Sequence, residues 1–121
     1  MTKTILAIDD SPSVRQMVQM TLKGAGYAVV EAVDGEDGLA KAQASRFDAV
    51  ITDQNMPKLD GIGFIRKFRE LPNAVGVPVV FLSTESRDDL KAEARAAGAT
   101  GWMTKPFDQD MLLNVVKKIA G

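Results

Sequence analysis

The sequence predicts an α/β fold in which a doubly wound parallel sheet of five strands is flanked by five helices. Apolar runs of four to six residues alternate along the chain with longer segments of helical period. These runs are apolar throughout, which is typical of parallel strands buried on both faces. Short connections and right-handed crossovers then favour the strand order 2-1-3-4-5, with a ligand crevice between strands 1 and 3.

Three of the expected helices begin at a residue that can cap them. Ser11 can cap a helix that starts at Pro12, because the fixed φ of proline suits a first helical turn, and Gly24 or Gly26 ends that helix. Asp34 can cap the next helix. The elements expected in this part of the chain are strands at 5–8 and 28–32 and helices at 12–24 and 34–44.

The same alternation continues through the second half of the chain. Gly98 stops an alanine-rich helix, and Asp108 can cap the last helix. The expected elements are a strand at 49–52 that ends on Asp53, a turn-rich stretch at 54–61, a helix at 64–69, a strand at 79–82, a helix at 87–97, a strand at 102–104 and the helix after residue 108.

Composition excludes several classes of function. With 121 residues, 45% of them hydrophobic, the chain can bury one core, so we expect a single domain spanning residues 1–121. The net charge of −1 without a basic run does not suit a nucleic-acid binder. The absence of cysteine and histidine excludes disulfides, thiolate chemistry, histidine-ligated zinc and Ser-His triads. No apolar run is long enough for a signal peptide or membrane span, so a cytoplasmic location is expected.

The polar residues that matter most follow the predicted strands directly. Because the carboxyl ends of parallel strands share one edge of a sheet, these side chains should converge on one crevice. They are Asp9 and Asp10 after strand 1, Asp53 at the end of strand 3, Ser83 after strand 4 and Lys105 after strand 5.

Three carboxylates in one crevice repel one another, so either one stays protonated or a cation neutralises them. All-oxygen ligands select a hard ion such as Mg²⁺. A carboxylate facing that ion, such as Asp53, can attack phosphorus. Lys105 would supply positive charge to phosphoryl oxygens, and the Ser83 hydroxyl could donate a hydrogen bond to one of them.

Each of these residues has an ordinary structural interpretation when taken alone. A single aspartate at a strand end is more often a helix cap, and a lone serine or lysine there is more often a cap or a surface residue. Three other binding motifs are excluded. The glycines at 24 and 26 end a helix instead of opening one after a strand, so they are not a dinucleotide-binding loop. Pro57 breaks a calcium-loop pattern that starts at Asp53, and no phosphate-binding glycine loop is present. The joint placement of the five residues therefore carries the hypothesis.

These residues make the chain resemble the receiver domain of two-component response regulators over essentially its whole length. The matching pieces are Asp9-Asp10, the stretch 53–57 with Gly61, Ser83 and the stretch 105–107. The resemblance implies a flavodoxin-like fold, and the end of the sequence after the fifth helix leads us to expect a stand-alone receiver without an output domain.

The resemblance assigns roles to the acidic residues. Asp53 would be the phosphoacceptor. Asp10, Asp53 and the backbone carbonyl of Asn55 would hold Mg²⁺, and Asp9 would act through a metal-bound water. The phosphoryl group would come from a histidine kinase in a self-catalysed reaction, so the protein would not be a turnover enzyme.

The resemblance also implies a switch. Lys105 would bridge to the phosphoryl group, with a cis peptide before Pro106 to aim it. Ser83 and Trp102 would be the switch pair, coupling the phosphoryl group to an output surface on the fourth helix, fifth strand and fifth helix. The residues expected on that partner face are Lys91, Arg95, Trp102, Met111 and Val115, which mix apolar and basic side chains.

Finer features resemble the CheY-type chemotaxis regulators. Asn55 and Glu85 flank the phosphoryl site where the family varies, and they are expected to tune its rates. Two residues depart from the usual pattern: Trp102 replaces a Tyr or Phe and could restrict the aromatic swing, and Thr84 replaces a small residue and could slow entry of small phosphodonors. The expected partners are a histidine kinase, the flagellar motor switch or another target, and a phosphatase; the protein is expected to be a monomer.

Several alternatives stay open. A phosphorelay intermediate or a phosphate sink would share every site residue. A Mg²⁺-dependent phosphohydrolase of the haloacid-dehalogenase type would need Asp-x-Asp after strand 1 and a cap domain, and a non-phosphorylated interaction module would be expected to have lost an acid or the lysine. Met20 could help to dock a kinase. For Met20, Met111 and Val115, a wide apolar core stripe is an equally good interpretation.

Overall fold

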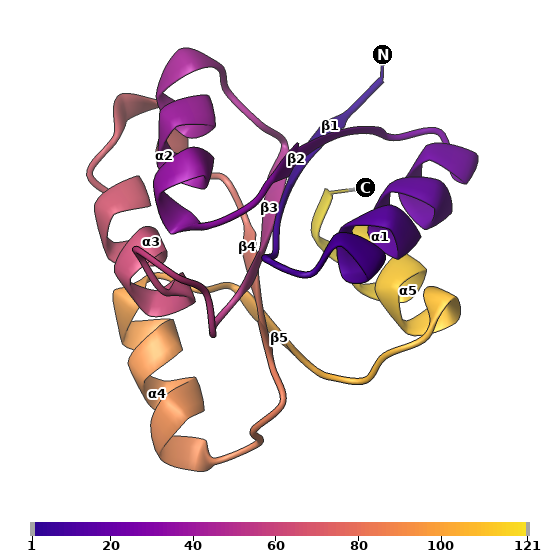
Figure 1. Cartoon of the computed structure of the whole chain (residues 1–121). Coiled ribbons are helices and arrows are strands. Elements are labelled where there is room, and N and C mark those ends of the chain that lie inside the picture. Colours follow the sequence, from indigo (N-terminus) through magenta and orange to yellow (C-terminus); the bar gives the residue numbers. More distant parts are fainter. Residues whose placement is uncertain (1, 121) are drawn as a thin grey trace.

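The computed structural model describes residues 2–120, which form a five-stranded parallel sheet between two layers of helices (Figure 1). The strand order is β2-β1-β3-β4-β5, which confirms the predicted topology. The elements are β1 (Thr4–Ile8), α1 (Pro12–Gly24), β2 (Ala28–Ala32), α2 (Gly35–Ala44), β3 (Ala49–Asp53), α3 (Gly61–Phe68), the short 3-10 helix η1 (Pro72–Ala74), β4 (Val79–Ser83), α4 (Asp88–Ala97), β5 (Gly101–Thr104) and α5 (Gln109–Ala120).

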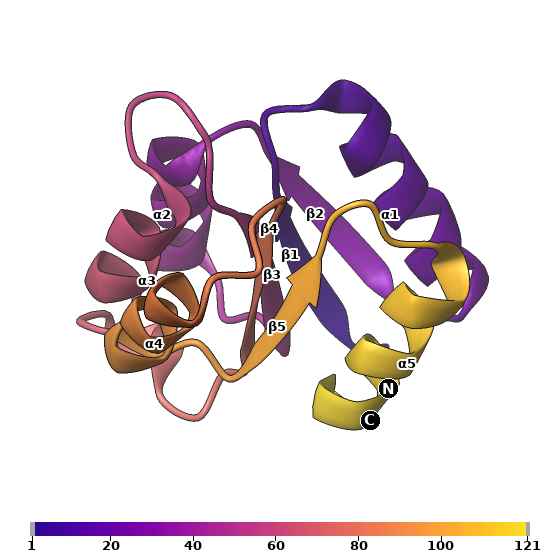
Figure 2. The same cartoon turned by 90° about the horizontal axis from the view of Figure 1, so that it is seen from below.

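Helices α1 and α5 cover one face of the sheet, and α2, α3 and α4 cover the other, as Figures 1 and 2 show. Side chains of β1 alternate between the two faces, so Ile5 packs in the core beneath α1 and α5 while Leu6 packs in the core beneath the other three helices. Strands β3 and β4 are buried along their whole length. A sheet covered on both faces explains why its strands read as continuous apolar runs.

The helix caps expected from the sequence are present. The side chain of Ser11 accepts a hydrogen bond from the Val14 amide, and that of Asp34 accepts from Asp37. Asp108 accepts from the Met111 amide at the start of α5. These contacts satisfy amide groups that have no partner within their own helix.

The helix predicted around residues 64–69 starts too late, since α3 spans Gly61–Phe68 with Arg69 as its C-cap residue. Asp60 caps it by accepting a hydrogen bond from the Gly63 amide at 2.7 Å. Gly61 and Gly63 lie in its first turn, and because glycine is a poor helix former the sequence predicted a loop there. Gly61 is required there because a Cβ atom at this position would overlap the carbonyl oxygen of Asp53. The start of α3 therefore packs directly on the backbone of the candidate phosphoacceptor.

Smaller differences concern element ends. The predicted helix at 87–97 begins at Asp88, with Arg87 as its N-cap residue, and the short helix η1 was not predicted. Within residues 2–120, no helix combines the length and the hydropathy needed to cross a bilayer.

Candidate functional site

Strand register brings the predicted polar residues to one edge of the sheet. Ile8 pairs with Thr52, so Asp9 and Asp53 follow side by side. Asp53 itself pairs with Leu82, which puts Ser83 at the next strand end. The amide of Lys105 donates to the Ser83 carbonyl at 2.8 Å, which ties the end of β5 to the end of β4. The predicted convergence of these segments is therefore present in the fold.

The three aspartates form one acidic cluster. One carboxylate oxygen from each of Asp9, Asp10 and Asp53 lies within 4.8 Å of the others. Asp9 and Asp53 are buried, with 3% and 6% of their surfaces exposed, whereas Asp10 is exposed. The cluster therefore has a buried floor and one side open to solvent.

Lys105 reaches into this cluster. Its Nζ lies 2.8 Å from Oδ2 of Asp9 and 3.2 Å from Oδ1 of Asp53, and 15% of its side chain is exposed. The peptide bond between Lys105 and Pro106 is cis. The lysine thus bridges the two buried carboxylates from the end of β5.

Burial and charge act on both partners. Burial raises the pKa of Asp53, the negative charge of Asp9 raises it further, and Lys105 opposes both effects. Burial by itself would lower the pKa of Lys105, but its hydrogen bond with Asp9 and the charges of Asp9 and Asp53 raise it overall. The lysine therefore stays protonated and offsets part of the charge of the cluster.

The donor set fits a hard divalent cation. Its side-chain ligands are carboxylate oxygens, one of them open to solvent, and hard cations such as Mg²⁺ prefer oxygen ligands and keep bound waters. Lys105 supplies only one positive charge to three carboxylates, so the cluster retains negative charge for an ion. Asn55, whose backbone carbonyl is expected to complete the ligand set, is exposed in the adjoining loop, two residues after β3.

Ser83 lies at the site but has another contact. The residue is buried, with 1% of its surface exposed, and its hydroxyl oxygen accepts a hydrogen bond from the Glu85 amide at 3.0 Å. The predicted rate-tuning residues Thr84 and Glu85 are exposed in the loop that follows. Glu85 forms an exposed ion pair with Arg87 at 3.0 Å.

Trp102 is held by three different contacts. Its ring packs against Phe81, with ring centroids 4.8 Å apart at 44°. Its indole N–H donates to Oγ1 of Thr104 at 3.2 Å, and Nζ of Lys91 lies 5.4 Å from the ring centroid. A cation at this distance over an aromatic face is attracted by the ring.

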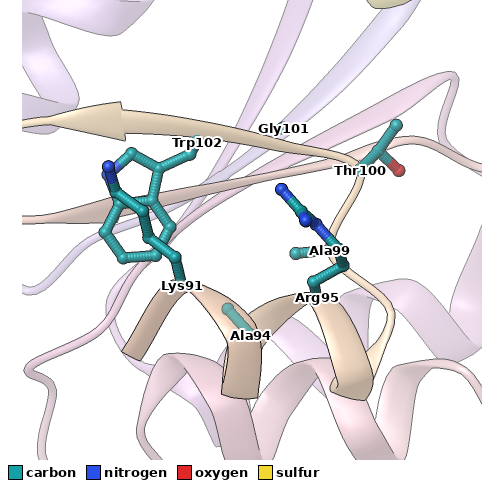
Figure 3. A pocket seen from close by; sticks show the side chains of 7 residues that line it. All are labelled: Lys91, Ala94, Arg95, Ala99, Thr100, Gly101 and Trp102. Carbon is teal, nitrogen blue, oxygen red and sulfur yellow. The ribbon is translucent and has the colours of Figure 1, made fainter. Parts of the chain in front are cut away.

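Residues of the predicted partner face line two separate hollows, one on each side of β5. Lys91 and Arg95 extend from α4 beside Trp102 around a small hollow, which Figure 3 shows. On the other side, Trp102 and Val115 line a wider groove of about 560 Å³ together with Lys118 of α5. Met111 contributes to neither hollow among those described for residues 2–120.

The methionines considered as either core or interface residues are exposed. Met20 has 63% of its surface exposed and Met111 has 43%, so the core interpretation is wrong for both. Val115 is half-buried: it packs against the core beneath α1 and α5 and also lines the wider groove, so its core contact leaves it available as an interface residue.

Two residues at the site were missed in the sequence. Gln54 accepts a hydrogen bond from the Ile62 amide at 2.9 Å and so helps to hold the start of α3. Arg15 donates from Nη1 to the backbone carbonyl of Asp9 at 2.7 Å. The sequence did contain one indication for Arg15: it is the fourth residue of the helix that follows Asp9 and Asp10, and so lies near them.

A family model described as the response regulator receiver domain matches residues 5–117. This chain belongs to that family. The receiver structure is similar to that of the chemotaxis response regulator CheY4 of Vibrio cholerae, with a TM-score of 0.95 and 44% identity over 98% of this chain and 99% of that chain. The chemotaxis protein CheY of Pseudomonas aeruginosa is 33% identical over 116 residues, which cover 95% of this chain and 94% of that protein.

A third similar structure bears on the acidic cluster. The receiver domain of a sensor histidine kinase from Pseudomonas aeruginosa is described with a magnesium ion coordinated in its active site cleft. It has a TM-score of 0.91 and 26% identity over 100% of this chain and 99% of that chain. Other relatives are longer: this receiver spans 13% of a gliding motility regulatory protein of Myxococcus xanthus and 44% of the transcriptional regulator PhoP of Bacillus subtilis.

Proposed function

We propose that this receiver domain accepts a phosphoryl group on Asp53 from a histidine kinase, in a reaction that requires Mg²⁺. The observation that carries the proposal is the acidic cluster itself. Asp53 lies at its buried floor, with the oxygens of Asp9 and Asp10 within 4.8 Å and the ammonium group of Lys105 at 3.2 Å. A nucleophilic carboxylate, ligands for a hard cation and a fixed positive charge are the groups that phosphoryl transfer to a carboxylate needs.

In the proposed reaction, an oxygen of Asp53 attacks the phosphorus of a phosphohistidine. The phosphorus–nitrogen bond breaks, its electron pair stays on the imidazole, which takes up a proton, and Asp53 becomes an acyl phosphate. Lys105 is close enough to Asp53 to contact the transferred group. Bound Mg²⁺, held by Asp10, Asp53 and the carbonyl of Asn55 with Asp9 acting through a water, would neutralise charge on the phosphoryl oxygens.

We propose that the chain catalyses its own phosphorylation and dephosphorylation and does not turn over a substrate. The three residues proposed to tune these rates, Asn55, Thr84 and Glu85, are exposed in the two loops after β3 and β4. Their exposure would let them contact an attacking water, a phosphodonor or a phosphatase that removes the phosphoryl group.

For the output we propose chemotaxis, with the flagellar motor switch as the partner and the cytoplasm as the location. The similarity to CheY4 and CheY, each covered over more than nine tenths of its length, supports this choice. The partner would contact Trp102 with the basic residues Lys91 and Arg95 on one side and Val115 on the other. Such a mixture of an aromatic residue with cations suits an acidic amphipathic helix.

A relay or phosphate-sink role is the second candidate, because a receiver domain of a sensor histidine kinase is among the similar structures. One experiment tests both. The protein is mixed with candidate histidine kinases carrying radiolabelled phosphate, and the label is followed with and without a histidine phosphotransfer protein. Transfer to this chain, followed by phosphate-dependent binding of a motor switch protein, would support the first proposal. Onward transfer of the label would support the relay, and no uptake from any kinase would contradict both.

A further inference from the structure

We propose that Arg15, held by Glu31, is a positioning residue for the acidic cluster. Nη1 of Arg15 donates to the backbone carbonyl of Asp9 at 2.7 Å, and its Nε donates to Oε1 of Glu31 at 3.2 Å. The side chain of Arg15 is 15% exposed and that of Glu31 is 38% exposed. The inference rests on the proposed Mg²⁺-dependent phosphorylation and concerns residues to which that proposal gives no role.

The contact to the Asp9 carbonyl matters because this oxygen belongs to the peptide group that joins Asp9 to Asp10. The orientation of that group sets the backbone angle on each side of it, and so the direction in which both carboxylates leave the chain. Strand β1 ends at Ile8, one residue earlier. Arg15 therefore holds the peptide group that follows Asp9, one residue beyond Ile8 and Thr52, the last pair of β1 and β3.

The other polar groups of Asp9 are also bonded. Its amide donates to the Ala32 carbonyl at 3.1 Å, Oδ1 accepts from the Ser11 amide at 2.9 Å, and Oδ2 accepts from Lys105 at 2.8 Å. Arg15 completes this set at the carbonyl. Buried polar networks that are fully bonded hold one geometry, and a network that loses one member loosens.

Arg15 and Lys105 carry the same charge but contact different atoms of the acidic cluster. Lys105 contacts carboxylate oxygens of Asp9 and Asp53, which are the atoms that a cation would use. Arg15 contacts the main chain and leaves those oxygens free. It can therefore orient the acid pair, and reduce the repulsion within it, while an ion is bound.

Glu31 explains why this position suits arginine. The guanidinium group is planar and offers several donors in fixed directions, so one nitrogen can meet the Asp9 carbonyl while another meets the carboxylate of Glu31. A lysine has one ammonium group and cannot hold both contacts with the same geometry. Glu31 lies in β2 opposite Ala7, so the pair ties the edge strand of the sheet to the acidic loop.

The test measures the affinity for MgCl₂ by isothermal titration calorimetry, urea unfolding in chelator, and the rate of phosphorylation by acetyl phosphate. The variants are Arg15→Met, Arg15→Lys, Glu31→Gln and the Arg15→Met/Glu31→Gln pair. Arg66→Met is the control for loss of an arginine–glutamate pair away from the cluster: Arg66 on α3 lies 3.5 Å from Glu93 of α4 and is more exposed than Arg15. Arg15→Lys keeps the positive charge, and its Mg²⁺ affinity is measured as well so that the test does not depend on the folding of Arg15→Met alone.

Residues that orient metal ligands typically change metal affinity 10- to 100-fold when removed. We expect Arg15→Met to weaken Mg²⁺ binding about tenfold, Arg15→Lys and Glu31→Gln to have intermediate effects, and the pair to be no worse than Arg15→Met, because Glu31 acts through Arg15. Arg66→Met should bind as the wild type does. If both Arg15 variants bind Mg²⁺ within about twofold of the wild type and lose only stability, Arg15 is a structural tie and the inference is wrong. A wild-type protein that neither binds Mg²⁺ nor is phosphorylated would instead contradict the proposed function.

Discussion

Lys105 places its ammonium nitrogen 3.2 Å from Oδ1 of Asp53, at the bottom of a cluster that also contains Asp9 and Asp10. Two buried carboxylates thus share one partly buried cation. In the proposed function the same positions receive a magnesium ion and a phosphoryl group. The stability of the domain and its chemistry therefore depend on the same charges.

Lys105→Met should destabilise the metal-free protein by about 3 kcal/mol, because breaking a buried ion pair leaves its charged partners uncompensated. Mg²⁺ should then stabilise the variant more than the wild type, since the ion would neutralise carboxylates that no longer have a lysine. Urea unfolding with chelator and with MgCl₂ measures both effects. Equal stabilisation of the two proteins by Mg²⁺ would argue against a shared site for lysine and ion.

Asp53→Asn should raise the free energy of unfolding at pH 7 when a chelator is present. Burial, followed by the charge of Asp9, raises the pKa of Asp53 above its ordinary value of 3.8 despite Lys105. A carboxyl group with a raised pKa in the folded state has no destabilising effect below its unfolded pKa, where both states are protonated, and its full effect above the folded pKa.

The gain from Asp53→Asn should therefore shrink as the pH falls toward the ordinary value of 3.8. Urea unfolding at a series of pH values from neutral downward measures it. Glu70→Gln, at an exposed carboxylate after α3, is the control for loss of one negative charge. A variant less stable than the wild type at pH 7, or a gain that does not change with pH, would contradict this electrostatic description.

Thr104→Val should release the indole of Trp102. Valine keeps the shape of threonine but cannot accept the indole hydrogen bond, which is 3.2 Å long. We expect a loss of about 1 kcal/mol in stability and a larger change in tryptophan fluorescence on phosphorylation, because the ring has one restraint fewer. Thr100→Val is the control, since its hydroxyl accepts from the Val79 amide instead. The restraint has no influence on the switch if both variants respond to phosphorylation as the wild type does.

Gly61→Ala should destabilise the protein by about 1–3 kcal/mol, as overpacking of a tight contact usually does. The added methyl group would meet the carbonyl oxygen of Asp53, a backbone atom that cannot move aside by rotating a side chain. Gly24→Ala is the matched control, because a Cβ atom there has no neighbour within 4 Å. Thermal unfolding of both variants tests the contact, and equal stability of the two would show that the start of α3 can shift freely.

The sequence predicted the order of strands and the meeting of Asp9, Asp10, Asp53 and Lys105, because both follow from local periodicity and from the common direction of parallel strands. It did not predict the start of α3, where Gly61 satisfies a steric demand set by Asp53, a residue eight positions away. Such a demand arises only once the elements pack.

Side-chain contacts between residues far apart in the chain could not be predicted from the sequence either. Arg15 meets Glu31 and the Asp9 carbonyl because α1 packs beside β2, and an arginine on an amphipathic helix otherwise reads as a surface residue. The hydrogen bond of Ser83 to the Glu85 amide depends on the path of a loop that has no periodic pattern. These contacts fix the orientation of the site residues, whereas the strand order determines where in the fold the site lies.

The central claim is that Asp53 is the phosphoacceptor, and intact-protein mass spectrometry tests it most directly. Wild type and Asp53→Asn are incubated with acetyl phosphate and MgCl₂, and parallel samples contain chelator. We expect the wild type to gain the mass of one phosphoryl group only when Mg²⁺ is present, and Asp53→Asn to gain none. The same mass gain in Asp53→Asn, or full phosphorylation of the wild type in chelator, would contradict the claim.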